Sequence, residues 1–71
     1  MEIKQTYTVY TIETGKPDTI QEFDNKHEAI STAISELVSS QGETGLQTRM
    51  DGEGNYIFIN YNAVKFVEKS A

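Results

Sequence analysis

The first part of the chain alternates polar positions with β-branched and aromatic ones. Residues 2–12 are rich in Thr, Tyr, Val and Ile and contain neither Gly nor Pro, a pattern typical of a β-strand. Residues 13–18 include Gly15 and Pro17, which favour a turn because Gly tolerates positive φ and Pro restricts φ. The short polar segment 19–23 then predicts a second strand, at the sheet edge, joined to the first by a hairpin.

Apolar side chains occur on both faces of the first predicted strand. Ile3, Tyr7 and Val9 share one face of an extended chain. Tyr10 and Ile12 share the opposite face. Either both faces are therefore partly buried, or a bulge near Val9 resets the alternation.

The middle of the chain has a helical repeat. Residues 26–40 carry apolar side chains every three or four positions, which predicts an amphipathic helix with one apolar stripe. Asn25, followed three residues later by Glu28, forms a pattern like a capping box at the start of this helix. Gly42 favours its end, because glycine readily adopts the left-handed cap conformation. The stripe consists of Ala29, Ile30, Ala33, Ile34, Leu37 and Val38.

Further β-prone segments follow the predicted helix. Residues 46–50 and 56–61 flank the turn-forming residues 51–55, so they predict a second hairpin. Residues 56–61 are apolar on both faces, as in a central strand, and residues 64–68 predict a last strand. The order β-β-α-β-β, with a fifth strand if the last segment joins, predicts a fold of the α+β class: a mainly antiparallel four- to five-stranded sheet with one helix packed on one face.

Composition limits the classes of protein that this chain can represent. The 71 residues are enough for one domain, residues 1–71. The net charge of −5 disfavours direct binding to nucleic acid. The longest apolar run, residues 56–59, is far shorter than the ~20 residues of a membrane helix. Because the chain has no cysteine and no recognisable secretory signal, we expect a cytoplasmic protein.

The sequence offers little for catalysis. The chain has one histidine, His27, at the start of the predicted helix, where a solvated surface position is expected. It has no cysteine nucleophile, and a general base needs a partner positioned beside it. We therefore expect a protein that is not an enzyme, with no cofactor and no identifiable small-molecule substrate.

Two short motifs imitate known binding loops. Residues 51–55 begin like a calcium loop, but Tyr56 and Asn62 occupy its sixth and twelfth positions, where an EF-hand needs Gly and Glu. Residues 42–45 have the G-x-x-G outline of some RNA-binding loops, but Glu43 would repel phosphate. We interpret the first motif as a hairpin turn and the second as the end of a helix followed by a loop.

One helix cannot cover the predicted sheet. A helix of this length is about 22 Å long and about 10 Å wide, whereas four or five strands make a sheet about 19–24 Å across. The opposite face has no element to cover it, so one of two apolar sets in residues 56–61 must be exposed there. The sets are Tyr56 with Phe58, and Ile57 with Ile59 and Tyr61.

A large exposed apolar patch usually marks an interface. We therefore expect a non-enzymatic interaction module that self-associates, most simply as a homodimer, or docks a protein partner through the helix-free sheet face. The aromatic residues of the strands are the interface candidates: Tyr10, Tyr56, Phe58, Tyr61 and Phe66.

The distribution of charge suggests an alternative. Residues 13–36 contain six acidic side chains against Lys16 and Lys26, so they hold −4 of the total charge of −5. Such a segment could imitate nucleic acid and bind a basic nucleic-acid-binding protein as an acidic antagonist. The candidates for this acidic patch are Glu13, Asp18, Glu22, Asp24, Glu28 and Glu36.

Overall fold

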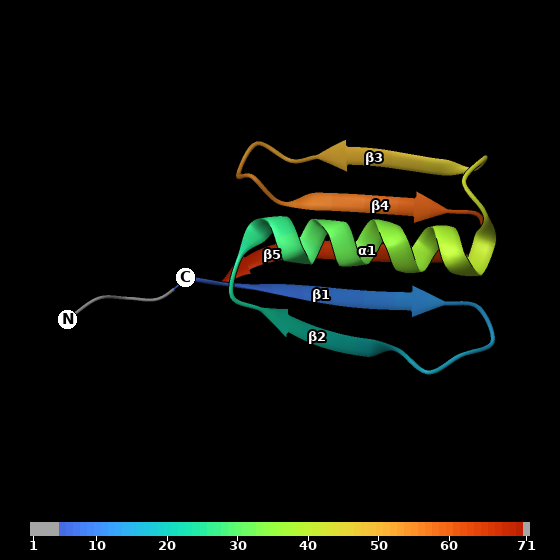
Figure 1. The fold of residues 1–71 in the computed structure, drawn as a ribbon, viewed down its shortest axis with the longest axis horizontal. Helices are drawn as coiled ribbons and strands as arrows, with labels where there is room; N and C mark the ends of the chain where they lie inside the picture. Colours follow the sequence, from blue (N-terminus) through green and yellow to red (C-terminus); the bar gives the residue numbers. More distant parts are fainter. Residues whose placement is uncertain (1–4, 71) are drawn as a thin grey trace.

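The computed structural model describes residues 5–70, which form one five-stranded antiparallel sheet and one helix (Figure 1). The elements are β1 (Thr6–Glu13), β2 (Thr19–Phe23), α1 (Lys26–Gln41), β3 (Leu46–Met50), β4 (Tyr56–Asn60) and β5 (Ala63–Ser70). The sheet has the order β2-β1-β5-β4-β3, so the last strand of the chain lies at its centre. The predicted α+β fold is confirmed, and the fifth strand is present.

The first strand has no bulge. Its pairing with β5 runs without interruption from Thr6 opposite Ser70 to Glu13 opposite Ala63. Both faces of β1 are therefore partly buried, which was the other alternative. The predicted position of Ile3 lies outside the described residues.

The predicted strand 56–61 is one residue too long. β4 ends at Asn60, which pairs with Ala63, so Tyr61 and Asn62 form the turn into β5. Tyr61 has φ 52°, a left-handed conformation that a strand residue does not adopt. The sequence supports two interpretations here, because Tyr61 has strong β propensity whereas Asn60 and Asn62 favour a bend over residues 60–63. The structure has the bend.

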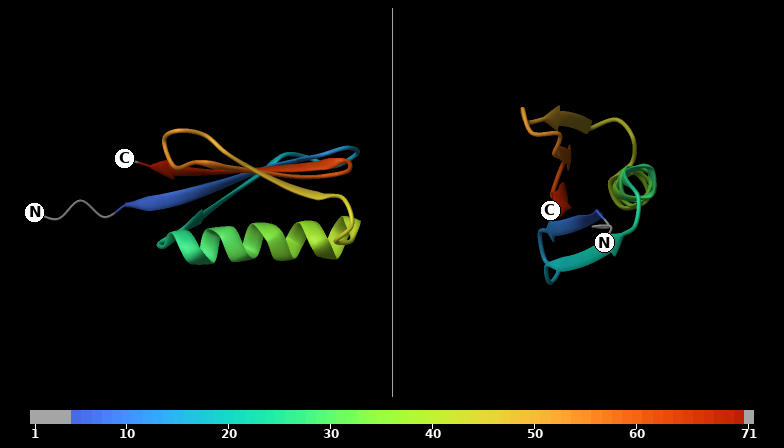
Figure 2. Two further views of the ribbon diagram at one scale, coloured as in Figure 1. Left: turned by 90° about the horizontal axis from the view of Figure 1, so that it is seen from above. Right: turned by 90° about the vertical axis from the view of Figure 1, so that its left-hand side faces the viewer.

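The core lies between α1 and one face of the sheet, which we call the helix side (Figure 2). The sheet contributes Val9, Phe58 and Val67, which are almost fully buried. The helix contributes two alanines and a leucine, which are its buried residues. These helix residues are Ala29, Ala33 and Leu37. The helix does not cover all of the helix side, because Met50 on the edge strand β3 remains 65% exposed.

Both ends of the helix are fixed by hydrogen bonds. The Asn25 side chain accepts a hydrogen bond from the Glu28 N–H at 2.8 Å, which confirms the predicted N-cap. Gly42 ends the helix and its N–H donates to the Val38 carbonyl. Its φ of 83° is positive, as glycine allows, but its ψ of 174° is extended instead of left-handed helical.

A buried lysine crosses from the sheet to the helix. Lys65 on β5 is 5% exposed. Its Nζ donates to Thr11 Oγ1 at 2.6 Å and to Glu36 Oε1 at 2.9 Å. The Glu36 side chain is 46% exposed, so the ion pair connects the interior to the surface. Nothing in the local sequence indicates this pair, because its members are 29 positions apart.

We expect Glu36→Ala to lower the free energy of unfolding by about 1–2 kcal/mol, because it leaves the buried Lys65 ammonium with only Thr11 as partner. The figure is below that of a fully buried pair because Glu36 is half-exposed. In a Lys65→Met background the same change should cost almost nothing. Urea denaturation of the four proteins measures this coupling. An equal loss in both backgrounds would show that the pair does not contribute.

Candidate functional site: the helix-free face of the sheet

The second face of the sheet carries no helix (Figure 2). Strand register places its side chains in rows that run across the sheet. One row crosses all the strands and the next crosses four of them. The first row is Ile20, Tyr10, Phe66, Ile57 and Arg49, and the second is Ile12, Val64, Ile59 and Gln47. We call the apolar members of these rows the apolar face: Tyr10, Ile12, Ile20, Ile57, Ile59, Val64 and Phe66.

The apolar face is continuous and partly open to solvent. Ile20 at the β2 edge is 65% exposed and Ile12 is 42% exposed. The other members are half-buried. The rings of Tyr10 and Phe66 contact each other with centroids 6.4 Å apart. A second protein layer would therefore remove further apolar surface from water on four strands, β1, β2, β4 and β5.

The structure divides the aromatic interface candidates between different surfaces. Tyr10 and Phe66 lie on the apolar face. Tyr56 and Phe58 lie on the helix side, where their rings stack at 6.0 Å and Phe58 enters the core. Tyr61 lies in the β4–β5 turn and is 60% exposed. Of the two sets in residues 56–61, it is therefore Ile57 and Ile59 that face away from the helix.

The interface candidates proposed from the sequence are all aromatic, so they do not include the aliphatic members of the apolar face. Strand pairing places Ile20 opposite Tyr10, and it places Val64 between Ile12 and Ile59. Only this pairing brings Ile12, Ile20 and Val64 into the apolar face. One signal in the sequence does indicate part of this patch: in the first strand Tyr10 and Ile12 lie on the same face, opposite to Tyr7 and Val9. Recognising the whole patch also needs the order of the strands.

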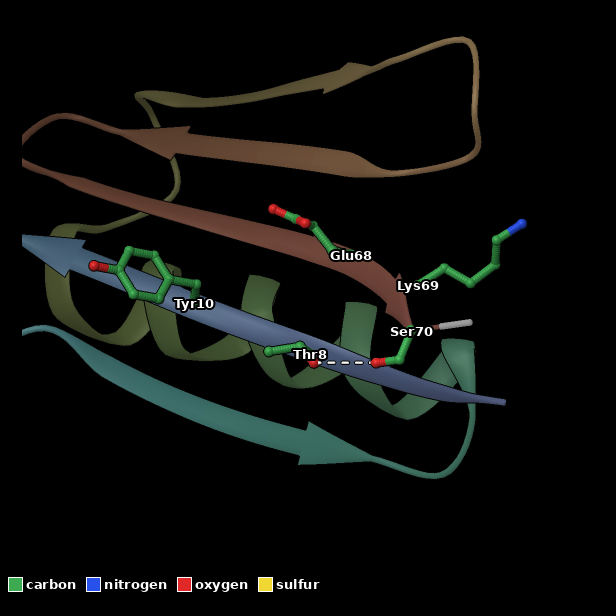
Figure 3. A pocket seen from close by; sticks show the side chains of 5 residues that line it. All are labelled: Thr8, Tyr10, Glu68, Lys69 and Ser70. Atoms are coloured by element: carbon green, nitrogen blue, oxygen red, sulfur yellow. Dashed lines mark hydrogen bonds between the residues drawn. The ribbon is translucent and has the colours of Figure 1, made fainter. Parts of the chain in front are cut away.

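Two hollows lie at the end of this face where polar side chains border the first apolar row. One hollow of about 370 Å³ lies between β1 and β5 and is lined by Thr8, Tyr10, Glu68, Lys69 and Ser70 (Figure 3). A second of about 170 Å³ lies on the β4 side and is lined by Asp51, Asn55, Tyr56, Ile57, Phe66 and Glu68. Glu68 lines both hollows, so it stands between them at the polar end of β5.

Charges of opposite sign lie at the two edges of the face. Arg49 is on β3, and Glu22 is on β2. Neither forms an ion pair within the described residues. Asp18 precedes β2 and accepts a hydrogen bond from the Tyr10 hydroxyl at 2.7 Å. This bond raises the pKa of Tyr10, with smaller contributions from burial and from the Asp18 charge. Tyr10 is therefore neutral and holds Asp18 at this edge.

The acidic patch candidates are distributed over the molecule. Glu13 is paired with Lys16 at 3.2 Å, and Glu36 is paired with Lys65. Asp18 lies at the β1–β2 end of the molecule, whereas Asp24 and Glu28 lie at the opposite end, where β2 leads into α1 (Figure 1). Glu22 lies between them on β2. The acidic-mimic hypothesis stays a prediction, without one surface that collects the six carboxylates.

The remaining candidate motifs have local structural roles. Asp51 accepts hydrogen bonds from the backbone N–H groups of Glu53 and Asn55 and from the Asn55 side chain. The bonds from Asn55, followed by that from Glu53, hold the pKa of Asp51 below its usual value. Asn55 in turn accepts from the Lys69 N–H, which ties this turn to β5. His27 is exposed in the first turn of α1.

Residues 5–70 contain no group of three or more His, Cys, Asp or Glu side chains arranged to hold a metal ion. Within the same residues, no helix has the length and apolar character needed to cross a membrane. Comparisons with models of known protein families, with curated proteins and with solved structures found no match. The fold and the site define a two-layer α+β domain with one apolar sheet face open to solvent.

Proposed function

We propose that the protein is a non-enzymatic interaction module whose apolar face binds a second copy of this chain. The observation that carries the proposal is the continuous apolar patch on a sheet face that no element of the described chain covers. Binding would bury this patch and release the water that contacts it. We place the protein in the cytoplasm, a compartment that its cysteine-free sequence fits.

The dimensions of the face agree with a small dimer interface. Five strands about 4.8 Å apart span about 24 Å, and strands of five to eight residues are about 17–26 Å long. This outline is about 400–600 Å² per copy, or about 800–1,200 Å² in total, which is near the lower limit for a specific complex. A second copy supplies a matching surface of the same size and character without a further protein.

The resulting dimer would have four layers, with the two sheets face to face about 10 Å apart and one helix on each outer side. The apolar residues of both copies would then lie in one shared core. Because the buried area is small, we expect a reversible dimer with a dissociation constant of about 1–100 µM.

Dilution tests the proposal directly. Sedimentation equilibrium or light scattering from about 1 µM to about 500 µM should show a mass that rises from the 8.0-kDa monomer towards twice that value. The heat capacity change on dissociation should be positive, because apolar surface becomes exposed. A constant mass of 8.0 kDa over the whole range would contradict the proposal.

A further inference from the structure

We infer that the two copies pack around a two-fold axis that runs close to the direction of β5, so that Arg49 of each copy lies over the acidic β2 edge of the other. This inference rests on the proposed dimer and specifies how it forms. It is carried by the placement of charge on the helix-free face: Arg49 is at one edge, and Asp18 and Glu22 are at the other.

Symmetry allows two simple ways to stack the faces. The two-fold axis that relates two packed sheets lies in the plane between them. An axis parallel to the strands exchanges the edges, because it places β3 of one copy over β2 of the other. An axis across the strands places each strand over its own copy, so β2 faces β2 and β3 faces β3.

The register favours the axis parallel to the strands. Arg49 lies on the same row as Ile20, and Asp18 and Glu22 stand on either side of Ile20 along the β2 edge. Packed sheets cross at about 30°, so the axis bisects the two β5 directions and lies about 15° from each. This crossing shifts an edge strand, about 10 Å from the axis, by about 5 Å along its partner. A shift in one direction brings Arg49 towards Glu22, and a shift in the other brings it towards Asp18. Asp18 already accepts a hydrogen bond from the Tyr10 hydroxyl, whereas Glu22 forms no ion pair within the described residues, so Glu22 is the partner that the variants test.

The axis across the strands places like charges opposite each other. An axis across the strands would place the two β2 edges together, so that Asp18 and Glu22 of one copy would face the acidic edge of the other. It would also leave Arg49 over β3, which carries no acidic side chain. Opposed like charges disfavour an interface, whereas complementary edges fix its register.

The axis parallel to the strands also brings the apolar residues of the two copies together in one core. It places β5 over β5, so that Phe66 and Val64 meet their own copies at the centre. Tyr10 on β1 then lies over the β4 strand that carries Ile57 and Ile59. One contact is unfavourable: Glu68 lies on β5 near the axis and would face its own copy. It lies beyond the apolar rows, beside the two hollows, where solvent reduces the repulsion.

Variants that neutralise a charge distinguish the two arrangements, because the arrangements predict opposite changes in the affinity of the dimer. For the axis parallel to the strands, Arg49→Gln and Glu22→Gln should each weaken the dimer about 2- to 10-fold at low salt, since two symmetric contacts are lost. Glu68→Gln should tighten it. Lys16→Gln changes the net charge by the same amount as Arg49→Gln but lies in the β1–β2 turn, so it is the matched control and should have no effect.

A charge exchange completes the test. Arg49→Glu should weaken the dimer more than Arg49→Gln, and adding Glu22→Lys in the same chain should recover most of the loss. Sedimentation equilibrium at about 50 mM and about 500 mM salt should show that these differences shrink as screening increases. If Glu22→Gln tightens the dimer, or Arg49→Gln behaves like Lys16→Gln, the arrangement is overturned although the dimer stands. A chain that is monomeric throughout refutes the proposed function instead.

Discussion

Phe66→Lys is expected to weaken the dimer by more than about 100-fold, the largest effect of any single change on the apolar face. Phe66 lies on the central strand and in the row that crosses the whole sheet. Its ring contacts Tyr10, so the substitution removes the centre of the patch. A lysine there would have to bury an unpaired ammonium group against the partner, and such central anchors dominate binding energies.

The control for this variant is Met50→Lys. It introduces the same charge at an apolar residue that is exposed, but Met50 lies on the helix side of β3, so the dissociation constant should stay within about twofold of wild type. Far-ultraviolet circular dichroism checks that both variants fold. Ile20→Lys is a second test at a position that is 65% exposed, where folding should not be affected; it should weaken the dimer at least about 10-fold. A folded Phe66→Lys protein with wild-type affinity would refute the proposed interface.

The two faces of the sheet differ in a way that supports an interaction. The centre of the helix side contains polar groups that have partners, among them Lys65 with Thr11 and Glu36. The centre of the helix-free face contains only apolar side chains, including the large Phe66 and Ile57. A monomer gains little from placing large apolar side chains on the solvated side of a sheet. A second layer of protein explains this distribution.

Much of this fold follows from local sequence pattern. The helix stripe, the Asn25 cap, the turns at residues 13–18 and 51–55 and the positions of the strands are visible because each depends on a few adjacent residues. The orientation of β4 could not be predicted, because both of its faces are apolar. Pairing with β5 decides it, since Phe58 stands opposite Lys65 on the helix side.

The polar groups of the core could not be predicted for a related reason. Lys65 stands between Val64 and Phe66 in the sequence, where alternation alone suggests a solvated side chain. It is buried because Glu36 on the helix and Thr11 on β1 supply its partners. Asn60 likewise ends an apolar strand, and only the tertiary structure brings the end of the helix to it. Long-range partners of this kind leave no mark on the neighbouring sequence.

Asn60→Asp is expected to lower the free energy of unfolding by at least about 3 kcal/mol at pH 7. Asn60 is fully buried, and its Nδ2 donates to the Gly42 carbonyl at 2.6 Å and the Leu37 carbonyl at 3.1 Å. These bonds attach the end of α1 to β4. The substitution replaces the donor with a carboxylate oxygen that faces two carbonyl oxygens in the interior, where an unpaired charge is costly. In a small domain this is a large part of the total stability.

The loss of stability in Asn60→Asp should increase with pH, which identifies the buried carboxylate as its cause. A protonated carboxyl keeps one O–H donor, so burial favours the neutral form and raises the folded-state pKa of the new Asp above its unfolded value of about 3.9. The variant should therefore be closest to wild type below about pH 4 and lose stability as the pH rises through the folded-state pKa. Urea denaturation at several pH values measures this. Asn62→Asp is the control, because it makes the same change at an exposed position in the adjacent turn and should be nearly neutral. A loss in Asn60→Asp that is below about 1 kcal/mol, or that does not grow between pH 4 and pH 7, would contradict the assigned role of Asn60.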